Sequence, residues 1–176
     1  MMFTRLQTPD THEYYNLKRL VLGVDFPWYY NNSSTHSGKE GDLSFYSHVV
    51  LGGPVPPNVA MPGQKRYSVV KSSFIDSFDV VVDQIFDLNN IPVNVVHRIN
   101  ANAVYPVKGN LLSEPHKDHE FPHKNLLVYL TDAGGDTICE GESFTPCEDD
   151  IVTFEGLHWM VPPKEKRRVV LVVTYS

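Results

Sequence analysis

Cysteine is scarce in this chain of 176 residues. Only Cys139 and Cys147 are present, and their spacing forms no Cys-x-x-Cys pair. A zinc ribbon is therefore excluded, and a small fold held together by disulfides has too few cysteines to form. We expect both cysteines to be free thiols.

Long apolar runs are also missing. No stretch approaches the roughly eighteen consecutive apolar residues that a membrane-spanning helix needs. The first residues, Met-Met-Phe-Thr-Arg, lack the apolar centre of a secretory signal. These absences predict a protein without a membrane partner and favour the cytoplasm as its location.

Positive charge is in the minority, with 15 Lys and Arg against 21 Asp and Glu and a net charge of −6. Proteins that grip nucleic acid need clustered cations to neutralise phosphates. The one basic cluster, residues 164–168, is short and typical of a solvated turn between strands. The composition thus argues against nucleic acid as the main partner.

Two imidazoles and one carboxylate stand out against this background. His116 and Asp118 flank Lys117, and His158 follows much later. Successive side chains of a strand alternate between its faces, so His116 and Asp118 would project to the same side. Three protein ligands on one face of an octahedral ion leave three positions open, as in non-haem Fe(II) oxygenases and unlike closed structural zinc sites.

Other histidines compete for this assignment. His119 and His123 lie close to the motif, and either could replace the first ligand. We favour His116 because it is the only histidine of this segment that stands two residues before an aspartate. The predicted metal ligands, and catalytic residues, are His116, Asp118 and His158.

An arginine begins the apolar run that follows His158. Arg168 immediately precedes residues 169–173, and such a buried arginine needs an anionic partner. A dicarboxylic acid would fit the paired donors of a guanidinium. Arg167 competes for this role; we favour Arg168 because it shares a strand face with Val170 and Val172.

The order of motifs from about residue 95 to 175 resembles the Fe(II)- and 2-oxoglutarate-dependent oxygenases, in their prolyl-4-hydroxylase-like branch. Tyr105-Pro106 precedes the His-x-Asp pair, as a Tyr-Pro does in prolyl hydroxylases. Residues 126–131, with Tyr129, resemble the strand whose tyrosine binds the far carboxylate of 2-oxoglutarate. Residues 134–137 resemble the family's Gly-Gly turn, and residues 146–154 resemble the strand that leads to the distal histidine.

The resemblance implies an enzyme, a 2-oxoglutarate-dependent dioxygenase that hydroxylates an unactivated C–H bond. Its cofactors would be Fe(II), 2-oxoglutarate and dioxygen, with ascorbate as an additional reductant. Arg168 and Tyr129 would bind the cosubstrate, and Tyr105 would contribute near its metal-bound end. The substrate could be a prolyl residue of a peptide or protein, or a small molecule. Two alternatives stay open: a cupin-like metal enzyme without 2-oxoglutarate, and a non-catalytic jelly-roll binding module.

The apolar patterning predicts an α+β fold that is mainly β. Apolar residues recur at helical spacing over residues 72–90, with Ser72 or Ser73 as N-cap, and a second helix is expected near residues 11–20. Short Val- and Ile-rich runs predict strands at residues 43–51, 91–99, 125–131, 151–154 and 169–175.

The resemblance names the architecture a double-stranded β-helix, or jelly roll. We expect a single oxygenase domain over residues 1–176, in which residues 1–90 support a core of residues 91–176. Two polar, Gly- and Pro-rich segments, residues 31–42 and 52–65, are candidates for binding loops or lids.

Overall fold

Two helices and eleven strands make up the part of the chain that the computed structural model describes, residues 2–34, 42–53, 68–109 and 111–176. The helices are α1 (His12–Leu22) and α2 (Ile75–Leu88). The strands are β1 (Thr4–Leu6), β2 (Tyr29–Asn31), β3 (Phe45–Gly52), β4 (Val69–Val70), β5 (Val96–Val104), β6 (Lys124–Tyr129), β7 (Thr137–Cys139), β8 (Glu142–Phe144), β9 (Ile151–Phe154), β10 (His158–Met160) and β11 (Arg168–Tyr175).

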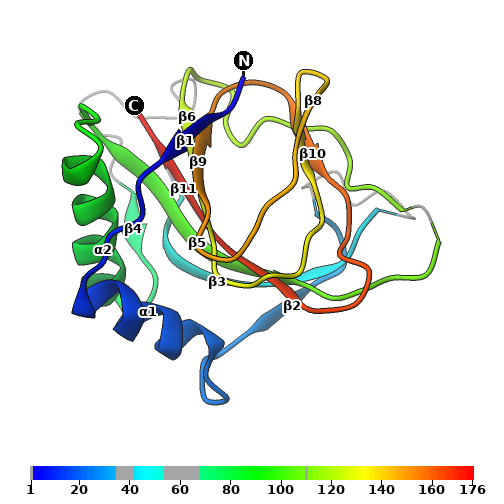
Figure 1. Cartoon of the computed structure of the whole chain (residues 1–176), viewed down its shortest axis with the longest axis horizontal. Coiled ribbons are helices and arrows are strands. Elements are labelled where there is room, and N and C mark those ends of the chain that lie inside the picture. Colours follow the sequence, from blue (N-terminus) through cyan, green and yellow to red (C-terminus); the bar gives the residue numbers. More distant parts are fainter. Residues whose placement is uncertain (1, 35–41, 54–67, 110) are drawn as a thin grey trace.

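The strands form two antiparallel sheets. The large sheet has the order β1-β9-β6-β11-β5-β3-β2, with β4 added beside β3, and the small sheet has the order β10-β7-β8. In Figure 1 the strands curl around a central space, and both helices lie against one side of the large sheet. The predicted fold class is confirmed: the chain is mainly β, with a jelly-roll core and two supporting helices.

The two faces of the large sheet have different roles. Alternate residues of β5 and β11, such as Ile99 and Leu171, point toward the helices and join a core with Val81 and Ile85 of α2. The opposite face closes on the small sheet, where Tyr129, Phe144 and Val170 pack together. The helices therefore support the sheet from outside and leave its inner face available for a site.

Both helices begin near their predicted positions. The Thr11 hydroxyl caps α1 by accepting a hydrogen bond from the Tyr14 N–H. The predicted serine cap of α2 is wrong: the helix starts at Ile75, and its N-cap, Phe74, makes no side-chain capping bond. The Ser72 hydroxyl instead binds the Phe74 N–H and the His48 ring.

The strand predicted for residues 91–99 begins only at Val96. Pro92 has no N–H to donate to a ladder. The N–H groups of Asn94 and Val95 donate to the Ser176 carbonyl instead. The other predicted strands lie within two residues of the observed ones.

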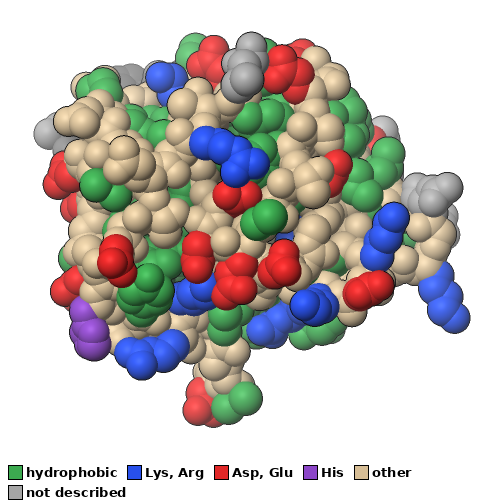
Figure 2. Space-filling model, in the orientation of Figure 1, with side chains coloured by type: hydrophobic (Ala, Val, Ile, Leu, Met, Phe, Trp, Pro, Cys, Tyr) green, Lys and Arg blue, Asp and Glu red, His purple; other side chains and the backbone are tan. Residues whose placement is uncertain are grey.

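Both cysteines are free, Cys139 buried and Cys147 exposed, as predicted. Among the described residues no helix is long and apolar enough to cross a membrane. On the face in Figure 2, basic and acidic side chains are interspersed, so the described part of this face has no broad basic surface. Residues 35–41 and 54–65 of the two candidate loops lie outside the described residues.

Candidate metal centre

Three side chains meet where β10 and the segment of residues 116–118 lie beside Arg98 of β5. His116, Asp118 and His158 each offer one ligand atom, and these atoms lie within 4.8 Å of one another. Among the described residues this is the only such group of histidine, cysteine and acidic side chains. The structure thus brings together the three residues that the sequence pattern singled out.

Backbone pairing places the two histidines side by side. The N–H of each donates to the carbonyl of the other, with both N···O distances 3.0 Å. This is a single antiparallel bridge, so His116 and Asp118 lie on an extended segment beside β10 and not within a regular strand. The extended backbone still turns both side chains to the same side, which is what the spacing predicted.

Hydrogen bonds orient both imidazoles. His116 Nδ1 lies 2.8 Å from the Glu114 carbonyl, and His158 Nδ1 lies 3.1 Å from the Gly156 carbonyl. A carbonyl can only accept, so each Nδ1 bears the proton and each Nε2 keeps a free lone pair. Metal-binding histidines are commonly held in this way. Burial lowers the pKa of His158, although Asp118 opposes the effect, which favours the neutral ring a metal requires.

The carboxylate of Asp118 has two different surroundings. Its Oδ1 accepts a hydrogen bond from Nη2 of Arg98 on β5. Its Oδ2 lies 3.4 Å from His158 Nε2, is buried, and has no hydrogen-bond partner among the described residues. Burial raises the pKa of Asp118, but Arg98 and the two imidazoles outweigh burial and leave it lowered. The group is therefore a carboxylate with one oxygen available for an ion.

Sequence reasoning missed Arg98, although its strand gave a signal. Arg98, Asn100 and Asn102 alternate with Ile99 and Ala101, so one face of β5 is polar and the other apolar. That polar face points into the barrel. Such a face inside a β-barrel indicates a binding cavity, because buried polar groups need partners.

The cavity beside the three ligand residues has a volume of about 420 Å³. Strands β3, β5, β6, β7, β10 and β11 contribute to its walls, together with the segments around residues 31–34 and 113–118. Its polar lining includes Ser47, Asn100 and Asn102, and its apolar lining includes Leu127, Val170 and Val172. Oδ1 of both asparagines is buried without a hydrogen-bond partner in the described part of the chain.

Arg168 lies in the same cavity, at the start of β11. Its side chain is 4% exposed, and no carboxylate pairs with it among the described residues. Nη2 donates to Thr137 Oγ1 at 3.0 Å, Nη1 lies 3.7 Å from Met160 Sδ, and Nε has no partner. A buried guanidinium without a counter-ion is costly, so this site favours an anionic ligand.

A glycine makes room for this arginine. Gly135 has φ +83°, and a Cβ there would lie 2.8 Å from the Val161 carbonyl oxygen and 3.1 Å from Arg168 Cδ. The neighbouring Gly134, at φ +64°, faces open space. Of the two glycines in the family-like turn, Gly135 is therefore the one that leaves space for Arg168.

The other predicted cosubstrate residues lie in different surroundings. The buried Tyr129 hydroxyl is 2.8 Å from Thr137 Oγ1, and the Arg168 guanidinium lies 5.1 Å above its ring. Tyr105 is 49% exposed, with its ring against Tyr46, and is not among the described residues that line the cavity. The competing Arg167 lies over the Trp28 ring.

The two competing histidines are engaged elsewhere. His119 Nε2 binds the Thr174 hydroxyl at 2.8 Å, and burial lowers the pKa of His119 to about 4. His123 Nδ1 lies 2.8 Å from the Phe121 carbonyl. Neither belongs to the three-residue group.

Asp42 is a second residue that the sequence did not single out. Its carboxylate accepts hydrogen bonds from the Ser33 hydroxyl, the Ser34 N–H and the Glu114 N–H, at 2.7, 2.7 and 3.1 Å. Ser33 and Ser34 line the cavity, and the Glu114 carbonyl orients His116. Asp42 thus joins one wall of the cavity to the segment that holds the first ligand.

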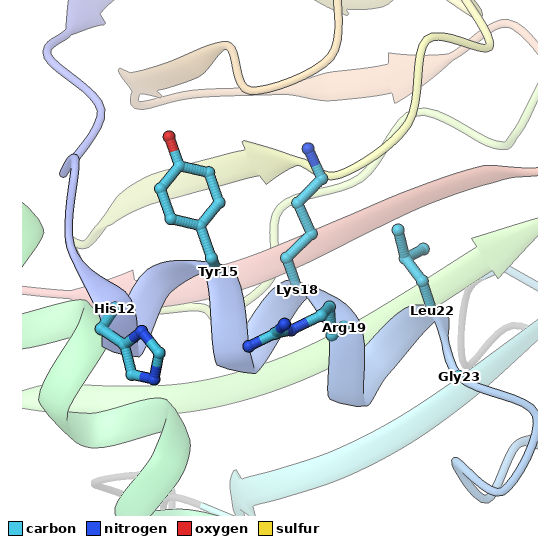
Figure 3. Close-up of a pocket in the computed structure, with 6 residues that line it drawn as sticks. All are labelled: His12, Tyr15, Lys18, Arg19, Leu22 and Gly23. Atoms are coloured by element: carbon cyan, nitrogen blue, oxygen red, sulfur yellow. The ribbon is translucent and has the colours of Figure 1, made fainter.

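A larger hollow of about 620 Å³ runs along α1. Figure 3 shows its side chains projecting from the helix without converging on one point. Lys18, one of the two cations that line it, already pairs with Glu148 and Asp149 at 2.6 and 2.7 Å. The hollow along α1 is therefore lined by ordinary helix-surface side chains, and the smaller cavity at the three ligand residues is the candidate site.

No protein-family model matches the chain, and no curated protein matches its sequence. Solved structures do match its fold. A 2OG-Fe(II) oxygenase family oxidoreductase from Burkholderia pseudomallei has a TM-score of 0.67 at 12% identity, over 99% of this chain and 85% of that one.

Two prolyl hydroxylases are also similar. The enzyme from Trichoplax adhaerens, in complex with a hypoxia inducible factor peptide fragment, has a TM-score of 0.58 at 13% identity, over 99% of this chain and 83% of that one. A prolyl-4-hydroxylase from Pseudomonas putida has a TM-score of 0.55 at 11% identity, over 99% and 91%. The resemblance stated from the motifs is confirmed at the level of the fold.

Proposed function

We propose that the chain is an Fe(II)- and 2-oxoglutarate-dependent dioxygenase that hydroxylates an unactivated C–H bond. One observation supports this more than any other. A group of two histidines and one aspartate shares a cavity with a buried arginine that has no counter-ion among the described residues. The two histidines and the aspartate suit a divalent metal, and the arginine suits an anionic ligand that also reaches the metal.

His116 and His158 would hold iron through Nε2, and Asp118 through Oδ2. The fit rests on the chemistry of the donors, since both imidazoles turn Nε2 toward the cluster and Oδ2 lacks any other partner. Three single-atom ligands leave three positions of an octahedron open. When bound, Fe(II) with 2-oxoglutarate would supply the activation of dioxygen that hydroxylation requires, with succinate and carbon dioxide as co-products.

Arg168 would bind the distal carboxylate of 2-oxoglutarate. Its two terminal nitrogens can take both carboxylate oxygens, a geometry that lysine cannot provide. Tyr129 supports this arginine from below and shares the Thr137 hydroxyl with it. Val170 and Val172 would exclude water between the arginine and the metal.

The primary substrate would lie against the polar wall of β3 and β5. Asn100 and Asn102 present amides that have no partner for Oδ1, so this wall suits a substrate with hydrogen-bonding groups. A peptide chain offers such groups on both sides of a prolyl residue. We therefore propose a prolyl residue of a peptide or protein as the first substrate to test, with polar small molecules second.

The deciding experiment is an anaerobic titration of the Fe(II)-loaded protein with 2-oxoglutarate, followed by the weak visible metal-to-ligand charge-transfer band. We expect a band in the wild type and its loss in His158→Ala. His12→Ala, on the surface of α1, is the matched control. Bound iron without a band in the wild type would contradict the proposal and favour a cupin-like enzyme, and absence of stoichiometric iron would favour a binding module.

The substrate proposal has a separate test. Succinate release is measured in air, with ascorbate present, for peptides that contain proline and for matched peptides with alanine in its place. Stimulation by the proline peptides alone, with a mass gain of one oxygen, would support prolyl hydroxylation. Equal stimulation by both peptides, or by neither, would contradict it while leaving the dioxygenase proposal standing.

A further inference from the structure

Among the described residues, Arg98 is the one cation in direct contact with the proposed ligand set. The proposed metal site requires only one atom from each ligand. A carboxylate can bind a metal through one oxygen or through both. If Asp118 used both, it would occupy two positions of an octahedral ion. Only two positions would then remain, and 2-oxoglutarate, which binds through two oxygens, would fill them both.

The surroundings of Asp118 separate its two oxygens. Oδ1 is occupied by Arg98 Nη2, while Oδ2 faces His158 Nε2 at 3.4 Å. The Asp118 side chain is 6% exposed and that of Arg98 is 20% exposed, so water competes little for this contact. A hydrogen bond between charged groups is about twice as strong as a neutral one. Rotation of the carboxylate to present both oxygens would break it.

Arg98 is itself held by regular structure. It lies in β5, opposite Thr174 of β11, in the middle of the large sheet. The Thr174 hydroxyl binds His119, the residue next to Asp118. The two central strands therefore contact consecutive residues of the segment that carries the ligand, and this segment has no regular strand of its own.

We infer that Arg98 is a positioning residue that keeps Asp118 a one-oxygen ligand, and so preserves the third open position at the metal. The inference rests on the proposed function. It adds a requirement that the three ligands alone do not meet: dioxygen has a position only while Arg98 occupies Oδ1. The positive charge of Arg98 also offsets the negative charge of the Asp118 carboxylate. The site therefore attracts a dianionic cosubstrate more strongly.

The test uses the full chain as Arg98→Met and Arg98→Lys, with Arg5→Met as control. Arg5 forms a surface ion pair with Asp150 at 2.9 Å, away from the cavity. Isothermal titration measures the binding of Mn(II), and then of 2-oxoglutarate to the Mn(II)-loaded protein. The charge-transfer band of the anaerobic Fe(II) protein at saturating 2-oxoglutarate reports two-oxygen binding. Binding of nitric oxide to this complex, followed by electron paramagnetic resonance, reports the third open position, and thermal unfolding of the metal-free protein reports folding.

We expect Arg98→Met to weaken 2-oxoglutarate binding, because the site loses the positive charge that offsets the Asp118 carboxylate. The band should persist at saturation, because two positions remain for 2-oxoglutarate, whereas the nitric oxide signal should be lost, and Arg98→Lys should recover part of that signal. Arg5→Met should match the wild type. Lower thermal stability with nitric oxide binding unchanged would show a merely structural role and overturn the inference. If the wild type has no band, the proposed function fails instead.

Discussion

Replacing Arg168 by methionine separates a role in binding from a role in folding. The guanidinium is 4% exposed and lacks a counter-ion among the described residues, so the folded protein holds a charge that water would solvate better. An uncompensated buried ion costs several kcal/mol, and apolar replacements of similar volume are often neutral or stabilising. Arg168→Met should therefore unfold at the same temperature as the wild type or higher, when metal and cosubstrate are absent.

The affinity of Arg168→Met for 2-oxoglutarate, in contrast to its stability, should fall. Truncating one partner of a buried, hydrogen-bonded charge pair costs about 2–5 kcal/mol. That corresponds to a loss of affinity for 2-oxoglutarate of roughly 30-fold to several thousand-fold. Each kcal/mol gained by the metal-free protein would raise its unfolding temperature by about 2–4 °C at this chain length.

The assay combines calorimetric unfolding of the metal-free proteins with titration of 2-oxoglutarate into their Mn(II)-loaded forms. Arg167→Met is the matched control, because that side chain lies over Trp28 and should leave cosubstrate affinity unchanged. If Arg168→Met lowers the unfolding temperature and retains wild-type affinity, Arg168 is a structural residue and the reasoning is wrong.

Three further changes test the supports of the site. Gly135→Ala should weaken 2-oxoglutarate binding at least tenfold, because its Cβ would collide with Val161 and Arg168. Gly134→Ala should cost only about 1 kcal/mol of stability from its positive φ. Equal cosubstrate affinities in the two variants, measured by titration, would contradict this. Tyr129→Phe removes one hydrogen bond to Thr137 and should weaken cosubstrate binding by about 2- to 10-fold in the same titration, and an unchanged affinity would exclude this supporting role. Burial raises the pKa of Asp42, but the hydrogen bonds to its carboxylate outweigh burial and lower the pKa to about 2. The ionised Asp42 therefore stabilises the fold above the unfolded pKa of about 4, and this stabilisation is lost as pH falls toward 2. Urea unfolding should show Asp42→Asn less stable than the wild type at pH 7, with a smaller difference at pH 3, and a difference independent of pH would refute the assignment.

The placement of His116 and Asp118 on one side could be predicted from the sequence because that argument is local, whereas His158 was singled out by the order of the motifs. The alternation that puts His116 and Asp118 on one side holds for any extended segment. The prediction therefore holds although these residues do not lie in a regular strand. The same locality explains the helices, whose apolar spacing follows from one period. The roles of His116, Asp118, His158, Arg168 and Tyr129 remain predictions until metal and cosubstrate are measured.

The missed residues depend on pairing between distant segments. Arg98 on β5 pairs with Asp118 on a segment outside the regular strands, and the Asp42 carboxylate accepts from the N–H of Glu114, 72 residues further along the chain. No spacing in one sequence reveals such contacts. For Tyr105, the position before the His-x-Asp motif suggested a place in the cavity. The residue follows the end of β5, and its ring is exposed beside Tyr46.

The reciprocal backbone bridge between His116 and His158 has a kinetic consequence. Two of the three proposed ligands are locked together by main-chain bonds, so they need no ordering when an ion arrives. The third, Asp118, belongs to a segment without such a ladder. Metal exchange should then follow local opening of residues 117–123 and not global unfolding. Amide hydrogen exchange would show it, with slow protons at His116 and His158 and faster ones beyond Asp118.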